Sequence, residues 1–154
     1  MTLAIGDKAP DFSMPADGDR TLSLKDFKGK NIVLYFYPKD DTPGCTVEAK
    51  DFSAMLSDFK AANTVVIGAS KDTVAKHDKF IGKHELSIPL LSDTDGELVE
   101  AYGVWVLKKL YGREYMGIER ATYLIDTQGI IQHIWRKVRV KGHAETVLSA
   151  AKAL

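Results

Sequence analysis

The chain has 154 residues, of which 45% are hydrophobic and 27% are charged, and its 21 lysines and arginines balance its 21 aspartates and glutamates. This length and composition are typical of one globular domain with a substantial core, here residues 1–154. The zero net charge and the lack of a basic block argue against nucleic acid or an anionic membrane as the partner. Residues 1–10 lack the pattern of a signal peptide, and no apolar run is long enough to span a bilayer. One cysteine cannot form an intramolecular disulfide, so the simplest compartment is the reducing cytoplasm.

The first part of the chain predicts a β-hairpin followed by a buried strand. The two arms of the hairpin, at 9–14 and 21–24, flank a segment with the composition of a turn. Residues 23–29 predict a single helical turn that ends at a glycine. The near-continuous apolar run over 31–37 is typical of a strand that is buried on both faces.

Helices and strands are then expected to alternate along the chain. After the cysteine, apolar residues spaced i, i+3, i+4 and i+7 predict the inward face of one helix, formed by Phe52, Met55, Leu56 and Phe59. The next expected elements are a strand at 64–70, a helix at 71–84 that begins at Asp72 or Thr73, a short strand at 88–91 and a short helix at 97–102.

The last third of the chain starts with its least regular stretch. Residues 103–119 contain three glycines among aromatic residues and lysines, and we interpret them as a long connection. Strands at 121–126 and 130–135 predict a second hairpin, and 142–154 predicts a closing helix. This order of elements predicts an α/β, thioredoxin-like fold: a central mixed β-sheet flanked by helices on both faces, with an N-terminal β-hairpin extension.

The single cysteine, Cys45, follows the buried strand through a cluster of turn residues. Thr42 is a good N-cap, and Pro43 suits the first position of a helix. Cys45 then occupies position N3, where unpaired N–H groups and the positive end of the helix dipole favour negative charge. A thiol there loses its proton more readily than a free cysteine does, and the thiolate is the nucleophile. A lone cysteine is more often an inert core residue, but this context favours a reactive one.

Residues 37–49, YPKDDTPGCTVEA, resemble the active-site segment of the peroxiredoxins, and within them the bacterioferritin comigratory protein, or peroxiredoxin Q, subfamily. The family pattern of proline, threonine and cysteine falls on Pro38, Thr42 and Cys45 without a gap. The resemblance covers nearly the whole chain and includes a second specific patch within 110–126.

This resemblance implies a thiol-dependent peroxidase that reduces hydrogen peroxide and small organic hydroperoxides. Peroxide would oxidise Cys45 to a sulfenic acid. Thr42, one turn earlier, can hydrogen-bond the sulfur or a peroxide oxygen besides capping the helix, and Pro38 offers a ring to shield the pocket. Composition does not choose among the arginines, but the family's pocket arginine falls on Arg120, and Glu48 matches the glutamate that orients it. No cofactor and no metal are implied.

The chain departs from the subfamily in one respect. Many relatives carry a second, resolving cysteine five residues after the first one or in the following helix, and these positions hold Lys50 and Ile81 here. An internal disulfide is therefore impossible, and the sulfenic acid is expected to be reduced by an external thiol, which is thioredoxin, glutaredoxin or glutathione. The resemblance further implies a monomer or a weak homodimer.

The residues leave two other functions open. The first is a cysteine–histidine acyl-transfer enzyme with His133 or His143 as the base, which does not explain the helix cap before the cysteine. The second is a thioredoxin-fold redox sensor or binding module in which Cys45 signals peroxide without efficient turnover. His77 and His84 lie seven residues apart in one predicted helix but have no partner at ligand spacing, so we expect solvated histidines and no metal site.

Overall fold

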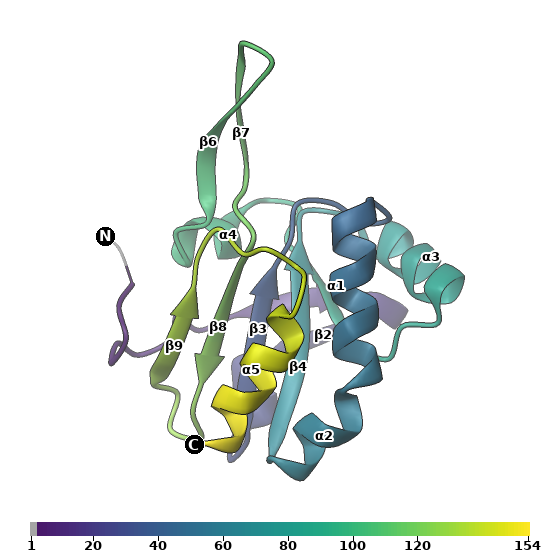
Figure 1. Ribbon diagram of the computed structural model, residues 1–154. Coiled ribbons are helices and arrows are strands. Elements are labelled where there is room, and N and C mark those ends of the chain that lie inside the picture. Colours follow the sequence, from purple (N-terminus) through teal and green to yellow (C-terminus); the bar gives the residue numbers. More distant parts are fainter. Residues whose placement is uncertain (1–2) are drawn as a thin grey trace.

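A seven-stranded sheet lies at the centre of the computed structural model, which describes residues 3–154 and so leaves the first two positions outside the description. The strand order across the sheet is β2-β1-β5-β4-β3-β8-β9. Figure 1 shows β4, β3, β8 and β9 side by side. The strands are β1 (Ser13–Ala16), β2 (Arg20–Ser23), β3 (Asn31–Phe36), β4 (Thr64–Ser70), β5 (Leu90–Ser92), β8 (Ala121–Ile125) and β9 (Ile131–Trp135).

The sheet is mixed, as predicted. β3 and β4 are parallel, as are β4 and β5, whereas β8 runs antiparallel to both β3 and β9. The predicted N-terminal hairpin is confirmed with shifted arms: β1 and β2 pair around a short 3₁₀ helix, η1 (Asp17–Asp19). β1 also pairs with β5 through Ala16 and Leu91, so the hairpin extends the edge of the central sheet.

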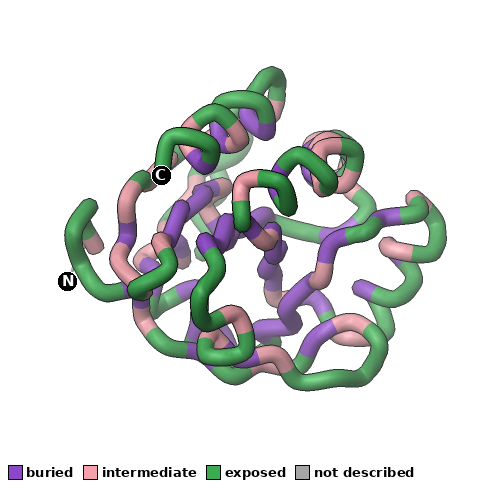
Figure 2. Tube along the Cα trace, turned by 90° about the horizontal axis from the view of Figure 1, so that it is seen from below, coloured by how far each residue is buried: buried purple, intermediate pink, exposed green. Residues whose placement is uncertain are grey.

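Helices cover both faces of the sheet. They are α1 (Pro43–Ala54), α2 (Leu56–Ala61), α3 (Val74–His84), α4 (Glu97–Ala101) and α5 (His143–Lys152), with a second 3₁₀ helix, η2 (Leu24–Phe27). All six residues of β3 are buried, and they alternate between two core clusters. Val33 and Tyr35 pack with α1 and α5, while Ile32 and Leu34 pack with α4 and the N-terminal segment. Figure 2 shows the buried strands between helices whose outer sides are exposed.

Two expected helices differ in detail from the structure. α3 begins after Thr73, whose hydroxyl accepts a hydrogen bond from the Lys76 amide, so the second of the two predicted starts is confirmed. The single helix expected after Cys45 is wrong, because the chain breaks at Met55 into α1 and α2. The Met55 amide is shared between the i−4 carbonyl of Asp51 and the i−3 carbonyl of Phe52, both at 3.2 Å, and Met55 itself leaves the helical conformation with φ of −97° and ψ of 6°. Among residues 3–154, no helix has the length and apolar character needed to cross a membrane.

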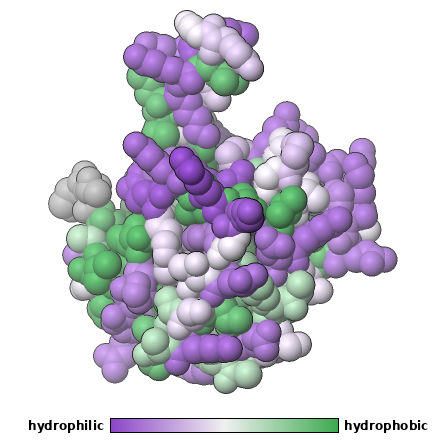
Figure 3. Space-filling model, in the orientation of Figure 1, coloured by the Kyte–Doolittle hydropathy of each residue, from purple (hydrophilic) through white to green (hydrophobic). Residues whose placement is uncertain are grey.

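The long connection predicted at 103–119 is also wrong. It forms β6 (Trp105–Leu110) and β7 (Arg113–Ile118), a two-stranded arm that projects from the rest of the molecule (Figure 1). The turn at Tyr111 and Gly112 has positive φ at both residues, 51° and 76°, which is typical of a tight hairpin. Most of the arm is exposed, and hydrophobic and hydrophilic residues lie side by side on it (Figure 3). The alternation of buried and polar residues that identifies strands in a sequence is therefore missing.

Candidate active site

Cys45 lies in the first turn of α1, directly after the loop that follows β3. Thr42 is the N-cap residue in an extended conformation and Pro43 is the first helical residue, so Cys45 occupies N3 as predicted. Its side chain is only 2% exposed and packs in one core cluster with Ala49 and Phe52. The thiol therefore lies at the positive end of the helix dipole, which favours the thiolate, and away from bulk water, which strengthens the interaction of the thiolate with a nearby charge.

Arg120 brings a positive charge to this sulfur. It lies between β7 and β8, and its Nη2 donates to Cys45 Sγ at 3.3 Å. Its Nη1 donates to Glu48 Oε1 at 2.6 Å. Cys45 and Glu48 are three residues apart on the same face of α1, so one guanidinium group bridges both side chains. The arginine that the structure places against the sulfur is thus the one that the resemblance indicated.

Glu48 is the most perturbed carboxylate of the site. Its side chain is 1% exposed, and Oε2 has no hydrogen-bond partner among the described residues. Burial raises the pKa of Glu48 to about 7, and the charge and hydrogen bond of Arg120 limit this rise. Burial would lower the pKa of Arg120, but the charges of Glu48 and Cys45 raise it above its usual value. The site therefore keeps a fixed positive charge beside a carboxyl group that titrates near neutral pH.

Two residues of the site were not predicted from the sequence. A Cβ atom at Gly44 would lie 3.2 Å from Arg120 Nη2, so the glycine at N2 leaves room for the guanidinium group. Lys108, on β6, makes no hydrogen bond to the sulfur, but the charges of the site act on it: burial and the charge of Arg120 lower its pKa, while the charges of Cys45 and Glu119 raise it. The contact of Gly44 depends on a residue far along the chain, and Lys108 lies in the stretch interpreted as a loop.

Thr42 and Pro38 lie in the adjoining loop and not on the sulfur. The Thr42 hydroxyl makes no capping hydrogen bond and instead donates to the Lys39 carbonyl at 2.9 Å. Its oxygen keeps lone pairs that can accept a further hydrogen bond. Pro38 is exposed. Of the five predicted site residues, the structure thus brings Cys45, Glu48 and Arg120 into contact and leaves Thr42 and Pro38 in the loop, and the roles of all five stay predictions.

None of the histidines in residues 3–154 forms a hydrogen bond with Cys45. His143 Nε2 pairs with Thr122 Oγ1 at 2.8 Å, and burial together with the charge of Arg120 lowers the pKa of His143 to about 4. His133 is exposed and stacks on Trp135. The acyl-transfer interpretation needs a cysteine–histidine pair, and neither candidate base supplies it.

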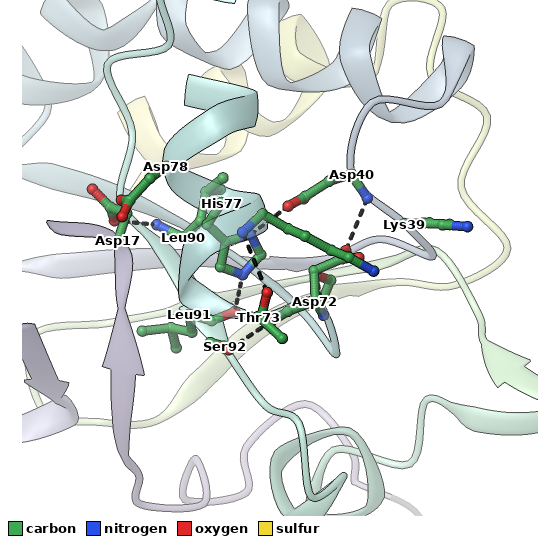
Figure 4. Close-up of polar contacts among 12 residues, drawn as sticks. Asp17, Lys39, Asp40, Asp72, Thr73, His77, Asp78, Leu90, Leu91 and Ser92 are labelled. Atoms are coloured by element: carbon green, nitrogen blue, oxygen red, sulfur yellow. Dashed lines mark hydrogen bonds and ion pairs between the residues drawn. The ribbon is translucent and has the colours of Figure 1, made fainter. Parts of the chain in front are cut away.

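The prediction that His77 is solvated is wrong, because its side chain is fully buried. His77 Nδ1 lies 2.7 Å from Asp40 Oδ2, and Nε2 lies 2.8 Å from the Leu91 carbonyl oxygen (Figure 4). The position three residues before Phe80, which is also buried, places His77 on the inward face of α3. That spacing was a signal in the sequence that this histidine faces the sheet.

A thiol at a helix N-terminus, in contact with a fixed guanidinium group on a thioredoxin-like sheet, defines a cysteine-dependent peroxidase. Comparison with known proteins agrees. Residues 5–134 match the AhpC/TSA family. Peroxiredoxin Bcp of Bacillus subtilis is 52% identical, over 99% of this chain and 97% of its own. A putative peroxiredoxin bcp of Coxiella burnetii is 50% identical, over 96% of this chain and 98% of its own.

Solved structures give the same result. A PrxQ variant of Xylella fastidiosa superposes with a TM-score of 0.95 at 39% identity, covering 99% of this chain and 98% of its own. The bacterioferritin comigratory protein of Xanthomonas campestris, studied for alkyl peroxide reduction, gives a TM-score of 0.88 at 42% identity, covering 92% of this chain and 90% of its own. The chain belongs to the AhpC/TSA family, among peroxiredoxins of the Bcp and PrxQ type. It is a thiol-dependent peroxidase, and the predicted thioredoxin-like fold is confirmed.

Proposed function

We propose that peroxide oxidises Cys45 and that an external thiol returns it to the reduced state. The observation that carries this proposal is the bridge made by Arg120, with Nη2 3.3 Å from the sulfur and Nη1 2.6 Å from the Glu48 carboxylate. A guanidinium group fixed in this way needs no reorganisation when charge develops on the reacting atoms. Because Cys45 is buried, the interaction takes place in a medium of low dielectric constant, where it is stronger than in water.

The peroxide step is a displacement at oxygen. The Cys45 thiolate attacks one oxygen of ROOH, the S–O bond forms, and the O–O bond breaks. The leaving alkoxide or hydroxide takes up a proton and departs as alcohol or water, while the sulfur is oxidised by two electrons to a sulfenic acid. Arg120 stabilises both the attacking thiolate and the charge that develops on the two oxygens. Glu48 holds the guanidinium group in the orientation that this requires.

Thr42 and Pro38 have supporting roles in this proposal. The Thr42 hydroxyl already donates to Lys39, so its oxygen is available to accept the O–H of a hydroperoxide. Pro38, which is exposed on the same loop, forms part of the wall that the substrate passes. Hydrogen peroxide and small organic hydroperoxides are the proposed substrates.

The reductive half of the cycle uses two equivalents of thiol. The first condenses with the sulfenic acid to a mixed disulfide and water, and the second displaces Cys45 and leaves as the oxidised disulfide. Cys45 is the only cysteine in the sequence, so no internal disulfide competes with the first step. Thioredoxin, glutaredoxin and glutathione are the proposed reductants. We further propose that residues 1–154 act as one domain, as a monomer or weak homodimer, in the reducing cytoplasm.

Steady-state peroxide consumption with dithiothreitol, followed for many turnovers, tests the proposed function. The wild-type protein is expected to consume peroxide in proportion to time, and C45S is expected to consume none while keeping its circular dichroism spectrum. Appreciable turnover by C45S would remove Cys45 from the reaction. Oxidation of Cys45 once, without further turnover in excess thiol, would instead support a redox sensor. Repeating the wild-type assay with each biological thiol system identifies the reductant.

A further inference from the structure

The loop between β3 and α1 determines where Cys45 lies, and little of the loop itself is regular structure. The last sheet-type hydrogen bond is from the Tyr37 amide to the Ala69 carbonyl at 3.2 Å, and α1 starts only at Pro43. Asp41, in between, has a left-handed conformation with φ of 59°. The helix cap makes no side-chain hydrogen bond to α1. Contacts from outside the loop must therefore fix the start of α1.

The main contact of this kind comes from His77 on α3. Its ring is 0% exposed, and both nitrogens are hydrogen-bonded, to Asp40 Oδ2 at 2.7 Å and to the Leu91 carbonyl at 2.8 Å (Figure 4). A carbonyl oxygen can only accept, so Nε2 carries a proton. Nδ1 faces a carboxylate, so the arrangement is satisfied when it carries a proton as well. His77 and Asp40 then form a buried ion pair of imidazolium and carboxylate.

The environment of His77 agrees with this protonation state. Burial alone would lower the pKa of His77, but the hydrogen bond and charge of Asp40, the Leu91 carbonyl and the charge of Asp72 raise it above its ordinary value of 6.5. The imidazolium is therefore stabilised by the groups that face it from the loop, from β5 and from the segment before α3.

Asp40 is hydrogen-bonded through both carboxylate oxygens and through its backbone amide. Its Oδ1 accepts from the Tyr37 hydroxyl at 2.5 Å, and its amide donates to Asp72 Oδ2 at 2.9 Å. Asp72 in turn accepts from the Ser70 hydroxyl at 2.7 Å. The loop is thus tied to the end of β4 and to α3 by a network whose polar groups satisfy each other, which is the condition under which a buried network specifies one geometry.

The three side chains Asp40, Asp72 and His77 lie close enough together to hold a cation. A metal would need a free lone pair on His77; Nε2 donates to the Leu91 carbonyl, and in the imidazolium–carboxylate pair Nδ1 carries a proton as well. The network is therefore a positioning device and not a metal site.

We propose that His77 is a positioning residue for peroxide reduction: through the Asp40 carboxylate it fixes the loop before α1, and so sets Cys45 against Arg120. The connection from the loop to the sulfur is short. The carbonyl of Lys39 accepts a hydrogen bond from the Thr42 hydroxyl at 2.9 Å, and Thr42 is the N-cap residue three positions before Cys45. A displacement of about 1 Å at a reacting atom can cost about a hundredfold in rate. The inference rests on the proposed oxidation of Cys45.

The same loop offers a matched control. Next to Asp40, Asp41 contacts Lys83 Nζ at 2.8 Å and His84 Nε2 at 2.7 Å, also on α3. The side chain of Asp41 is 42% exposed and that of Lys83 is 57% exposed, so water and ions screen the ion pair between them. Losing the exposed contact is expected to leave the loop where the buried contact holds it.

The test measures the second-order rate constant for oxidation of Cys45 by hydrogen peroxide in single turnover, below the unfolding temperature of every variant. We expect H77L, which has no donor, to slow this step by at least about tenfold, and H77Q, whose amide NH₂ can still donate, to slow it less. D40N is expected to slow it as well. The double variant D40N/H77Q should lose no more than the worse single variant, because both residues act on one loop. K83Q is expected to stay within about twofold of wild type.

A merely structural role of His77 would lower the unfolding temperature and leave the rate constant of the folded protein unchanged. Folded H77Q and D40N with wild-type rate constants would therefore overturn the proposal, and so would additive losses in the double variant. If H77L does not fold, H77Q and D40N decide by the same criterion. Failure of the wild-type protein to be oxidised at Cys45 would contradict the proposed function instead, so the two failures are distinguishable.

Discussion

Two buried ion pairs flank the start of α1, and they differ in what they touch. Arg120 Nη1 lies 2.6 Å from Glu48 Oε1, and the side chain of Arg120 is 16% exposed and that of Glu48 1% exposed. The same guanidinium group contacts the sulfur of Cys45. His77 Nδ1 lies 2.7 Å from Asp40 Oδ2, and the side chain of His77 is 0% exposed and that of Asp40 5% exposed. Neither residue forms a hydrogen bond with the sulfur. The first pair sets the charge around the reacting atom, and the second sets the place of the backbone that carries it.

The two pairs also differ in how completely they are satisfied. Glu48 Oε2 has no partner among the described residues, and burial raises the pKa of Glu48 to about 7. Both oxygens of Asp40 accept a hydrogen bond, from Tyr37 and from His77. An incompletely paired carboxyl group can change charge at modest cost, whereas a fully paired one holds its geometry. The ion pair of Arg120 and Glu48 thus serves the chemistry at the sulfur, whereas the ion pair of His77 and Asp40 serves to hold the loop before α1 in place.

The largest expected effect is on stability, from breaking the pair that does not touch the sulfur. D40A leaves His77 buried without its partner, and we expect the free energy of unfolding to fall by about 3–5 kcal/mol. Urea unfolding followed by tryptophan fluorescence measures it, with D41A, which removes only the exposed contact, as the matched control. A loss no larger than that of D41A would mean that the buried pair does not stabilise the fold.

The next effect is on the peroxide step, from removing the charge at the sulfur. R120A is expected to slow oxidation of Cys45 by about 10²–10³-fold, the usual loss when a preorganised donor is removed. Alkylation of Cys45 by iodoacetamide at neutral pH should slow as well, because the thiolate loses its positive neighbour. R136A is the control, since Arg136 also pairs with a glutamate, Glu119, but makes no hydrogen bond to the sulfur. Equal rates for R120A and R136A would exclude Arg120 from the reaction.

A smaller effect is expected from the carboxylate that orients this arginine. E48Q keeps the shape and an acceptor oxygen of Glu48 but removes its charge, so at pH 8 we expect the peroxide step to slow by about tenfold, because the hydrogen bond from Arg120 loses its charge assistance. Glu48 takes up a proton below about pH 7 and then resembles the glutamine. The ratio of the wild-type and E48Q rate constants should therefore fall toward one as the pH drops from 8 to 6. A ratio that is constant with pH would show that the charge of Glu48 is not used.

The smallest effect is expected at the exposed contact of the loop. Lys83 and His84 lower the pKa of Asp41 by hydrogen bonding, but the carboxylate is open to solvent. D41N should change the rate constant for peroxide by no more than about twofold, and the change should vanish in high salt. A loss as large as that of D40N would mean that exposure does not separate the two contacts.

Much of the fold and half of the site could be predicted because the responsible signals are local. The run of apolar residues over β3 predicts a buried strand, and the sequence from Thr42 through Pro43 to Cys45 is typical of a helix N-terminus. These features depend on neighbours in the sequence, so propensity and spacing suffice. Arg120 is different: its place at the sulfur follows from the antiparallel pairing of β8 with β3, and the sequence offered several arginines. The resemblance to a family was needed to select it.

Two of the errors have identifiable physical causes. Most residues of β6 and β7 are exposed, so no buried face imposes an alternation of apolar and polar residues on their sequence. The sequence of this arm therefore resembles that of an irregular connection. The sequence does not predict that His77 is buried and paired, because its partners come from distant parts of the chain: Asp40 lies before α1, and Leu91 lies on β5. A polar residue on the inward face of a helix can be expected to have such a partner, but the sequence does not say which one.

Trapping of oxidised Cys45 tests the central claim most directly. The protein is treated with one equivalent of hydrogen peroxide in the presence of dimedone, and its intact mass and tryptic peptides are measured. We expect one dimedone adduct, located on Cys45, and its disappearance when a reducing thiol is present before the trap. A thiol that stays unmodified and free after peroxide treatment would contradict the account, because the contacts of Arg120 with Cys45 and Glu48 would then not activate the sulfur.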